Sequence, residues 1–334
     1  MAEVGYLIGA GASADCVPVV NGMANNANEI LIQLDKILMG THGFEIANYS
    51  GIERNLIRIQ NKRILEKIFN ICDNHSSIDT YAKKLYISRD KTKYYELKND
   101  LSYYFTLVQI LKKPDKRYDN FWASILSNSK PPSKVSIFSW NYDFQFEKSY
   151  MEFGGTKSLN TTWSMLGICS PNYPMDRNGE ENFNFTKLNG SARFNNKNNM
   201  NGSYFCEFTS DEINKNLGNL FKIYFSMYDK YGEYNNELNF AWEEDKSNVL
   251  LKSIRPVLQK INVLVIIGYS FPFFNRKIDE RLFEGMTSLN RIIIQDPDAH
   301  NIHERLKEFL PSSIDKIELR GDKVQFVFPK ELDI

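Results

Sequence analysis

The feature that most constrains the fold of this chain lies near its start, where an apolar run breaks into a glycine-rich turn. Val4 to Ile8 is followed directly by Gly9-Ala10-Gly11-Ala12-Ser13. A strand that turns through glycines into a helix presents backbone N–H groups to a phosphate in nucleotide-binding folds. Gly9 permits the tight turn, Gly11 lets a pyrophosphate approach, and Ala14 occupies the third small position of a G-x-G-x-x-G/A pattern. An ordinary turn between strand and helix is the alternative interpretation.

Length and charge limit the class of protein. With 334 residues, the chain is long for one compact domain and short for three, so we expect one α/β core with a sizeable insertion. Lys plus Arg and Asp plus Glu number 41 each, which indicates neither a nucleic-acid nor a membrane surface. No apolar run reaches the length of a membrane span, and the N-terminus lacks the features of a secretory signal. We therefore expect a cytoplasmic protein.

The cysteines argue against a structural zinc site. They are Cys16, Cys72, Cys169 and Cys206, and no two of them form a CxxC pair. Structural zinc sites use such pairs, so we expect no bound metal. Free thiols in a reducing compartment are the simplest interpretation.

Apolar periodicity predicts a helical block in the first half of the chain. A helix is predicted over 25–38, and apolar residues from Ile52 to Ile71 recur at helical spacing. Further helices are predicted over 78–85, 95–111 and 121–126. We expect a mostly helical insertion over 40–130, and a Rossmann-like core formed by 1–38 and 133–334.

Short apolar runs predict the remaining strands of the core. They cover 135–138, 263–267, 292–294 and 324–328, and the second and third are typical of parallel strands buried on both faces. Residues 161–185 are predicted to be loop-rich and 195–201 to form an exposed loop. Helices are predicted over 211–231, with Ser210 as N-cap, and over 299–310.

Polar or glycine residues follow four of the predicted strands. These segments are Gly9 to Ser13, Asn141 to Asp143, Gly268 to Ser270, and Asp296. In doubly wound parallel sheets, ligands bind beyond the carboxyl ends of the strands. The sequence therefore predicts an α/β fold with a Rossmann-like doubly wound sheet and a nucleotide site at that edge. The alternative is that these are only turn residues.

The ordered set of segments resembles the sirtuin-like family, in particular its bacterial defence branch. The resemblance is carried by Gly9 to Ser13, Asn141-Tyr142-Asp143 with Glu147, Lys187-Leu188-Asn189-Gly190-Ser191, and Gly268-Tyr269-Ser270, which together run through most of the chain. It implies NAD binding in a Rossmann-type domain beside a smaller helical domain.

Two departures from the family pattern refine this expectation. Protein-deacylating sirtuins carry a zinc ribbon of two CxxC pairs, which this chain lacks, so protein deacylation is not expected. The defence relatives lack the ribbon and hydrolyse NAD to ADP-ribose and nicotinamide, which deprives a phage of its host's NAD. The family's catalytic histidine stands in a Lys-Leu-His-Gly pattern, where this chain has Asn189.

Cleavage of the nicotinamide–ribose bond sets the chemical needs of such a site. It forms an oxocarbenium-like centre and releases neutral nicotinamide, so it requires an orienting group, a positioned water and a base. Asn141 matches the family's asparagine at the base of the nicotinamide pocket, where its amide would orient a water or ribose hydroxyl. Its alternative role is to cap a helix that starts at Tyr142. Asp143 is expected to hydrogen-bond near the pocket or to serve as a helix N-terminal carboxylate.

Asn189 cannot act as a base, because a side-chain amide does not titrate in this range. It can still hydrogen-bond a ribose hydroxyl. Three explanations remain open: a naturally impaired chain that binds NAD without fast turnover, an inactivating His-to-Asn substitution, or a base supplied by another residue. His42 and His75 lie in the predicted helical block, from which either could approach the pocket. His300 and His303 share one helix face, where they could bind a metal ion or, alternatively, are exposed side chains.

The remaining site residues are assigned to cofactor binding. Asp296 is expected to accept hydrogen bonds from the adenosine ribose, or else to form a turn with Pro297. Ser13 is expected to donate to a phosphate, and Gly268 and Ser270 to pass close to the cofactor. Tyr269 is expected to pack.

Two functions follow as hypotheses. The first is an NAD hydrolase subunit of an antiphage system, and the alternative is a non-catalytic nucleotide-binding or scaffold subunit of a heteromeric defence complex. The chain ends soon after its last predicted strand, so we expect a homo-oligomer or a separate sensor subunit to regulate it. An ordinary dehydrogenase is disfavoured, because the region about 20 residues after the glycine turn, near Glu29, is predicted to be helical.

Overall fold

The computed structural model describes residues 3–19, 22–38, 51–128, 130–175, 182–196, 203–204, 213–227, 234–308, 310, 314 and 316–332. A seven-stranded sheet with order β10-β9-β8-β1-β2-β4-β3 forms its centre, and every pair of neighbours in it is parallel. Its strands are β1 (Glu3–Ile8), β2 (Val135–Ser139), β3 (Ile168–Cys169), β4 (Asn184–Lys187), β8 (Ile261–Ile267), β9 (Arg291–Gln295) and β10 (Lys316–Arg320). The predicted doubly wound α/β fold is thereby confirmed.

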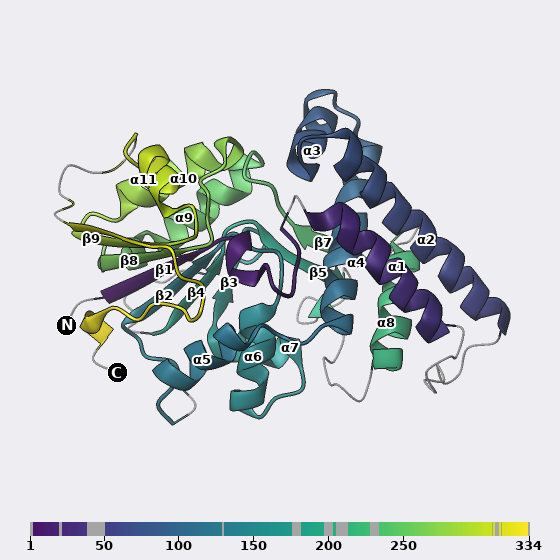
Figure 1. The fold of residues 1–334 in the computed structure, drawn as a ribbon, viewed down its shortest axis with the longest axis horizontal. Helices are drawn as coiled ribbons and strands as arrows, with labels where there is room; N and C mark the ends of the chain where they lie inside the picture. Colours follow the sequence, from purple (N-terminus) through teal and green to yellow (C-terminus); the bar gives the residue numbers. More distant parts are fainter. Residues whose placement is uncertain are drawn as a thin grey trace.

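Helices cover both faces of this sheet (Figure 1). On one side lie α9 (Glu244–Leu258), α10 (Arg276–Gly285) and α11 (Ala299–Leu306), and on the other α5 (Lys116–Ile125), α6 (Gln145–Gly154) and α7 (Leu159–Leu166). Successive side chains of β1 point to opposite faces of the sheet, and each face has its own helix layer. Leu7 packs in the core that includes α9 to α11, whereas Tyr6 and Ile8 pack with α5 and α6. Apolar strands buried on both faces result.

A second group of elements lies beside the sheet (right side of Figure 1). It contains α1 (Met23–Leu38), α2 (Gly51–Asn74), α3 (Ile78–Ile87), α4 (Lys91–Leu111) and α8 (Ile213–Ser226), with a small antiparallel sheet of β6 (Ser203–Tyr204), β5 (Gly190–Asn196) and β7 (Tyr234–Leu238). Its make-up differs from the expected insertion over 40–130. Helix α1 packs on α2 and α8 packs on α4, while α5 packs on α6 beside the large sheet.

The sheet has a topological switch point at β1. The chain passes from β1 to β2 and β4 on one side, and later places β8 on the other side of β1, followed by β9 and β10. Ligands of open α/β sheets bind in the crevice that this reversal opens at the carboxyl ends of the strands. The short 3₁₀ helices η1 (Ala10–Ser13) and η4 (Phe273–Asn275) follow β1 and β8 at that edge.

The predicted strand over 324–328 is wrong. The last strand is β10, whereas 324–328 is irregular. The Gln295 side chain binds its backbone, accepting from Val327 N at 3.1 Å and donating to Gln325 O at 2.6 Å. Phe326 packs against the ring of Tyr118 at 5.1 Å. A side chain therefore takes the place of a neighbouring strand.

Other predicted elements differ in extent. The region 161–185 contains most of α7, all of β3 and the start of β4, and residues 195–196 end β5. The predicted helix over 299–310 ends as α11 at Leu306. Ser210, residues 197–201, His42 and Cys206 lie outside the described residues.

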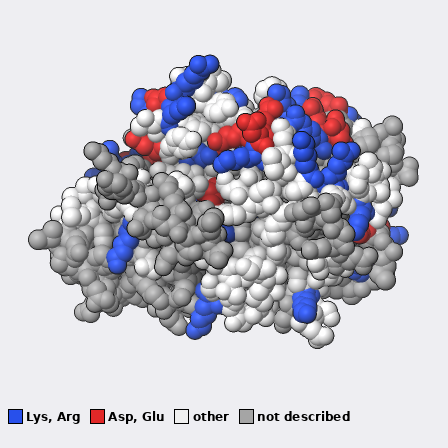
Figure 2. Space-filling model, turned by 180° about the vertical axis from the view of Figure 1, so that it is seen from behind, with Lys and Arg blue, Asp and Glu red and all other residues white. Residues whose placement is uncertain are grey.

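Charged side chains of both signs are mixed on the surface, as the upper part of Figure 2 shows. Ion pairs join neighbouring surface segments, with Lys277 Nζ of α10 3.1 Å from Glu244 Oε1 of α9, and Arg276 Nη2 of α10 2.6 Å from Oε2 of Glu308, which follows α11. Within the described ranges, no helix combines the length and apolarity that a bilayer crossing requires. The same ranges contain no cluster of His, Cys, Asp or Glu side chains suited to a metal ion.

Candidate functional site

A cavity of about 570 Å³ opens at the carboxyl ends of the central strands. All of the predicted site residues except Gly9 line it: Ala10, Gly11 and Ser13 after β1, Asn141 and Asp143 after β2, Asn189 after β4, Gly268 and Ser270 after β8, and Asp296 after β9. A larger hollow of about 730 Å³ lies over α2, away from the strand ends. The structure therefore brings the dispersed sequence motifs together at the switch point, where ligands of such sheets bind.

The glycines at this edge allow two loops to touch. A Cβ on Gly9 would lie 2.5 Å from Gly268 O, and Gly268 itself has φ +61° with Gly11 against it. The Gly11 N–H donates to Gly268 O at 2.9 Å, so this amide is already used. Close packing of the two loops therefore explains the glycines better than the approach of a pyrophosphate. Ala10, which begins η1, exposes its surface to the cavity.

The glycine turn does not enter an α-helix directly. It forms η1, and α1 begins only at Met23. Ala14, at the third small position of the glycine pattern, is exposed and lies outside the cavity lining.

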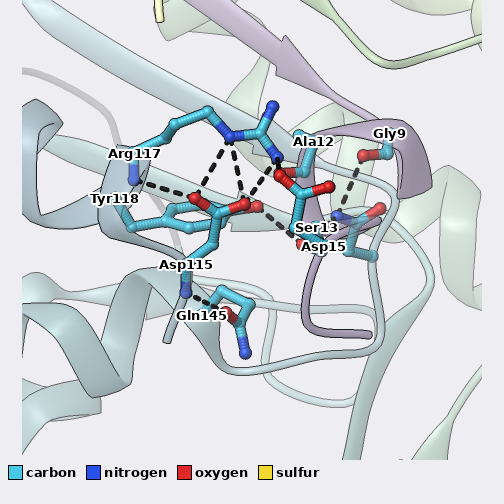
Figure 3. A network of polar contacts seen from close by, with 9 residues as sticks. Gly9, Ala12, Ser13, Asp15, Asp115, Arg117, Tyr118 and Gln145 are labelled. Atoms are coloured by element: carbon cyan, nitrogen blue, oxygen red, sulfur yellow. Dashed lines mark hydrogen bonds and ion pairs between the residues drawn. The ribbon is translucent and has the colours of Figure 1, made fainter. Parts of the chain in front are cut away.

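Side chains from the start of α5 hold this turn in place (Figure 3). Arg117 Nη2 donates to Ala12 O at 3.0 Å and pairs with Asp115 Oδ2 at 2.5 Å. The Ser13 and Tyr118 hydroxyls lie 2.6 Å apart. Because Ser13 is buried and bonded inside the protein, it serves first to fix the turn rather than as a free phosphate donor.

Asn141 ties the end of β2 to the same turn. Its Nδ2 donates to Gly9 O at 3.0 Å and to Ser13 Oγ at 3.2 Å. Helix α6 begins at Gln145 with Phe144 at its N-cap, so the alternative role of Asn141 as a helix cap is wrong. An amide held in this way is a fixed orienting group on the cavity wall.

Buried charges support the segment that carries Asn141. Lys187 Nζ lies 2.9 Å from Glu147 Oε1 and also donates to Asp143 O, and the Lys187 and Glu147 side chains are almost fully buried. Asp143 Oδ1 accepts from Gln145 N at 3.2 Å, so it is a helix N-terminal carboxylate that also lines the cavity. Burial raises the pKa of both carboxyl groups, and Lys187 opposes that shift.

Asn189 presents an unsatisfied acceptor at the site. Its Nδ2 donates to Tyr142 OH at 3.3 Å, whereas its buried Oδ1 has no hydrogen-bond partner among the described residues. The residue is only 7% exposed and lines the cavity. An unpaired buried acceptor costs about 1–3 kcal/mol, which a donor hydroxyl on a ligand would recover.

The loops after β8 and β9 form the opposite wall. Tyr269 packs as expected, stacked on Trp140 with ring centroids 5.7 Å apart, and its hydroxyl donates to Asp279 Oδ2 at 2.8 Å. Ser270 is exposed at the cavity. Asp296 Oδ1 accepts from Asp298 N at 2.8 Å, which makes it a turn residue as well as a lining residue.

Aromatic rings supply an apolar part of the wall that the sequence motifs did not indicate. The lining includes Phe105, Trp140, Phe240, Trp242, Phe273 and Phe274. The Phe240 and Trp242 rings stack at 4.6 Å with an interplanar angle of 5°. Flat apolar surfaces next to a few polar groups are typical of sites for heterocyclic ligands.

Asp79 is the second feature missing from the sequence motifs. It lies in the first turn of α3, lines the cavity, and is partly buried. Burial raises the pKa of its carboxyl group from 3.8 to about 6. Nothing in its local sequence distinguishes it from any acidic residue near a helix start.

The ionised Asp79 carboxylate is expected to lower the free energy of unfolding at neutral pH. Because burial raises the pKa of the folded protein's Asp79, the protonated carboxyl group is retained at low pH without a loss of stability. The free energy of unfolding is therefore highest below about pH 4, and it falls as pH rises through about 6 and the buried carboxyl group ionises. Asp79→Asn is therefore expected to raise the free energy of unfolding at pH 7 by about 2–3 kcal/mol and to change it little at pH 4. Urea unfolding at both pH values measures this. Equal effects at the two pH values would contradict the assigned ionisation.

The described histidines do not reach the cavity. His300 and His303 lie on α11, and the His75 ring packs on Tyr81 with centroids 4.8 Å apart. None of these three lines the cavity. The base that the sequence left open is therefore not one of them.

The cavity is acidic. Its charged lining residues among the described ranges are Asp79, Asp143 and Asp296, and Lys or Arg is absent from that lining. A pyrophosphate would then depend on backbone N–H groups and hydroxyls. Helix α10 begins directly after the lining residue Asn275, and helix N-termini favour anions.

Fold and cavity define a Rossmann-like α/β protein with a candidate ligand site at its switch point. No protein-family model matches the sequence, and no curated protein is recognisably similar to it. The function of the cavity is therefore argued from its chemistry.

Proposed function

We propose that the chain binds NAD in this cavity and is a sirtuin-like NAD hydrolase, which converts NAD to ADP-ribose and nicotinamide. The observation that carries the proposal is the meeting of the turn after β1, Asn141 after β2 and Asn189 after β4 at one cavity. These are the segments on which the resemblance to the family depends. The unpartnered Asn189 Oδ1 and the aromatic wall suit a ribose hydroxyl and a heterocycle.

Each side chain has a role in this proposal. Asn141, fixed by Gly9 and Ser13, orients the water or ribose hydroxyl on the attacking face. Asn189 accepts a hydrogen bond from a ribose hydroxyl. Asp296 and Ser270, on the opposite wall, accept and donate to the adenosine half. The turn at Ala10 faces the pyrophosphate.

A nucleotide-binding subunit without turnover is the second candidate function. Asn189 favours it, because a side chain that cannot take a proton stands where the family has a histidine. Loss of a positioned base costs on the order of 10²–10⁴ in rate. In this case the chain would bind NAD or a related nucleotide in a heteromeric complex.

The resemblance also motivates a biological setting. We extend the proposal to a bacterial antiphage defence system, in which a homo-oligomer or a separate sensor subunit controls NAD depletion. An uncontrolled NAD hydrolase would harm its own host. Neither direct nucleic-acid binding nor a membrane partner is part of this proposal, since the surface charges are of mixed sign (Figure 2).

The substitution Asn189→His tests the catalytic role of this position. It is expected to raise the rate of nicotinamide release at least tenfold, because an imidazole adds a base beside the reacting centre. Chromatographic measurement of nicotinamide released from NAD gives the rate, with Asn301→His on the exposed face of α11 as the matched control. Absence of release from both the natural chain and Asn189→His, alone and with partner proteins, would refute hydrolysis. Tight NAD binding without release supports the second function.

A further inference from the structure

Asp79 lines the cavity from the helical group beside the large sheet. It stands at the start of α3, which Ser77 caps by accepting from Thr80 N at 3.0 Å. Ser76, Ser77 and Ile78 line the cavity with it, and Tyr142 and Asn189 line it from the ends of β2 and β4. The helical group therefore contributes an acidic side chain to the cavity that Asn189, at the position of the family's histidine, also lines.

The Asp79 carboxylate is available for a ligand. Among the described residues it takes part in no hydrogen bond and no ion pair, in contrast to Asp143 and Asp296. The lining of the same cavity includes the apolar rings of Phe105, Phe240 and Trp242. A partly buried carboxylate without a hydrogen-bond or ion-pair partner costs free energy.

Tyr142 links Asp79 to Asn189 electrostatically. Burial, and then the Asp79 charge, raise the pKa of the Tyr142 hydroxyl, which keeps its proton and accepts from Asn189 Nδ2 at 3.3 Å. The three polar groups thus face one part of the cavity. Asn189 and Tyr142 can orient hydroxyls, but only Asp79 changes its protonation state near neutral pH, with a pKa of about 6.

The other ionisable groups around Asp79 do not neutralise it. Glu243 is paired with Lys98, at 3.0 Å between Oε2 and Nζ, and Tyr94 and Tyr142 keep their protons because their pKa values are raised. Lys83, one turn along α3, lies over the Trp242 ring at 5.0 Å. Asp143, in the segment that follows β2, receives its charge compensation from Lys187.

We propose that Asp79 is the base of this site and takes over the task that the family assigns to the histidine replaced by Asn189. The inference rests on the proposed NAD hydrolysis. The bond between C1′ and the nicotinamide nitrogen breaks, and its electron pair leaves with neutral nicotinamide. A water oxygen then bonds to C1′ while Asp79 takes the proton of that water and later releases it to solvent. The Asp79 charge also stabilises the positive centre at C1′.

Asp79→Asn, which is isosteric and uncharged, tests this role. It is expected to lower kcat for nicotinamide release at least 100-fold while NAD affinity changes less than threefold, as measured by calorimetry. In the natural chain, kcat should rise tenfold per pH unit below about pH 6 and level off above it. Asp79→Glu should keep part of the rate. Asp73→Asn, an exposed acidic position at the end of α2, is the matched control and should behave as the natural chain does.

Four outcomes decide the inference. If the natural chain hydrolyses NAD and Asp79→Asn does so equally fast, Asp79 is not the base while the proposed function stands. If the natural chain binds NAD but releases no nicotinamide at any pH, the proposed hydrolysis is refuted, and the assignment of Asp79 as its base is refuted as well. A parallel loss of affinity and kcat in Asp79→Asn would show a binding role and overturn the base assignment. The pH profile of the natural chain needs no substitution, so a rate that does not change between pH 5 and 7 also overturns it.

Discussion

Lys187→Met is expected to lower the free energy of unfolding by about 3–5 kcal/mol. The substitution keeps most of the apolar volume but leaves Glu147 buried without its counter-charge, because Glu147 Oε1 lies 2.9 Å from Lys187 Nζ and both side chains are at most 1% exposed. It also removes the donor to Asp143 O. The segment that carries Asn141 would lose its support, so the effect should reach the cavity.

Matched variants separate charge from packing. The double variant Lys187→Met/Glu147→Gln should recover at least half of the lost stability, because no uncompensated charge remains buried. Lys157→Met, at an exposed position, should change stability by less than about 0.5 kcal/mol. Urea unfolding measures all three. A loss below about 1 kcal/mol for Lys187→Met would contradict the claim that this pair supports the β2–α6 segment.

The sheet was predictable from local sequence because its strands are apolar on both faces. Val263 to Ile267 has no polar position, which only a strand covered by helices on both sides tolerates. The last strand was not predictable in the same way. Residues 324–328 are as apolar as a strand, but the Gln295 side chain occupies their backbone groups, and 316–320 joins the sheet instead.

The candidate site was predictable where its residues follow strands. Asn141, Asn189 and Asp296 meet because the carboxyl ends of parallel strands share one edge. The structural reason for the glycines could not be predicted, because Gly9 contacts the loop at Gly268, which is far away in the sequence. A glycine required by a neighbouring backbone looks the same in sequence as one required by a phosphate.

The helical contribution to the cavity could not be predicted at all. Asp79 belongs to the amphipathic helix α3, and Phe105 to α4, whose residues 100–110 are all buried; neither pattern marks a ligand site. Their position at the cavity depends on how the helical group packs beside the sheet, and no local signal encodes that packing.

Ala10→Asp is expected to weaken NAD binding at least 100-fold. Ala10 is exposed at the start of η1 and lines the cavity, so the new carboxylate would stand where the proposal places the pyrophosphate. Two like charges about 4 Å apart repel by about 4 kcal/mol at an effective dielectric constant of 20, which exceeds the predicted loss. Because the residue is exposed, the fold should be unaffected, which thermal melting checks.

Ala14→Asp provides the control for this change. Ala14 ends the same 3₁₀ turn, is also exposed, and lies outside the cavity lining. The same charge is thus added to the same turn, a few residues away from the proposed ligand. General effects of net charge or of the turn's stability would affect both variants alike.

The central claim, that NAD binds at the carboxyl ends of the central strands, is tested most directly by calorimetric titration of NAD into the natural chain, Ala10→Asp and Ala14→Asp. The account predicts equal affinity for the natural chain and Ala14→Asp, and at least 100-fold weaker binding for Ala10→Asp. No binding of NAD to the natural chain, or equal binding by all three proteins, would contradict it.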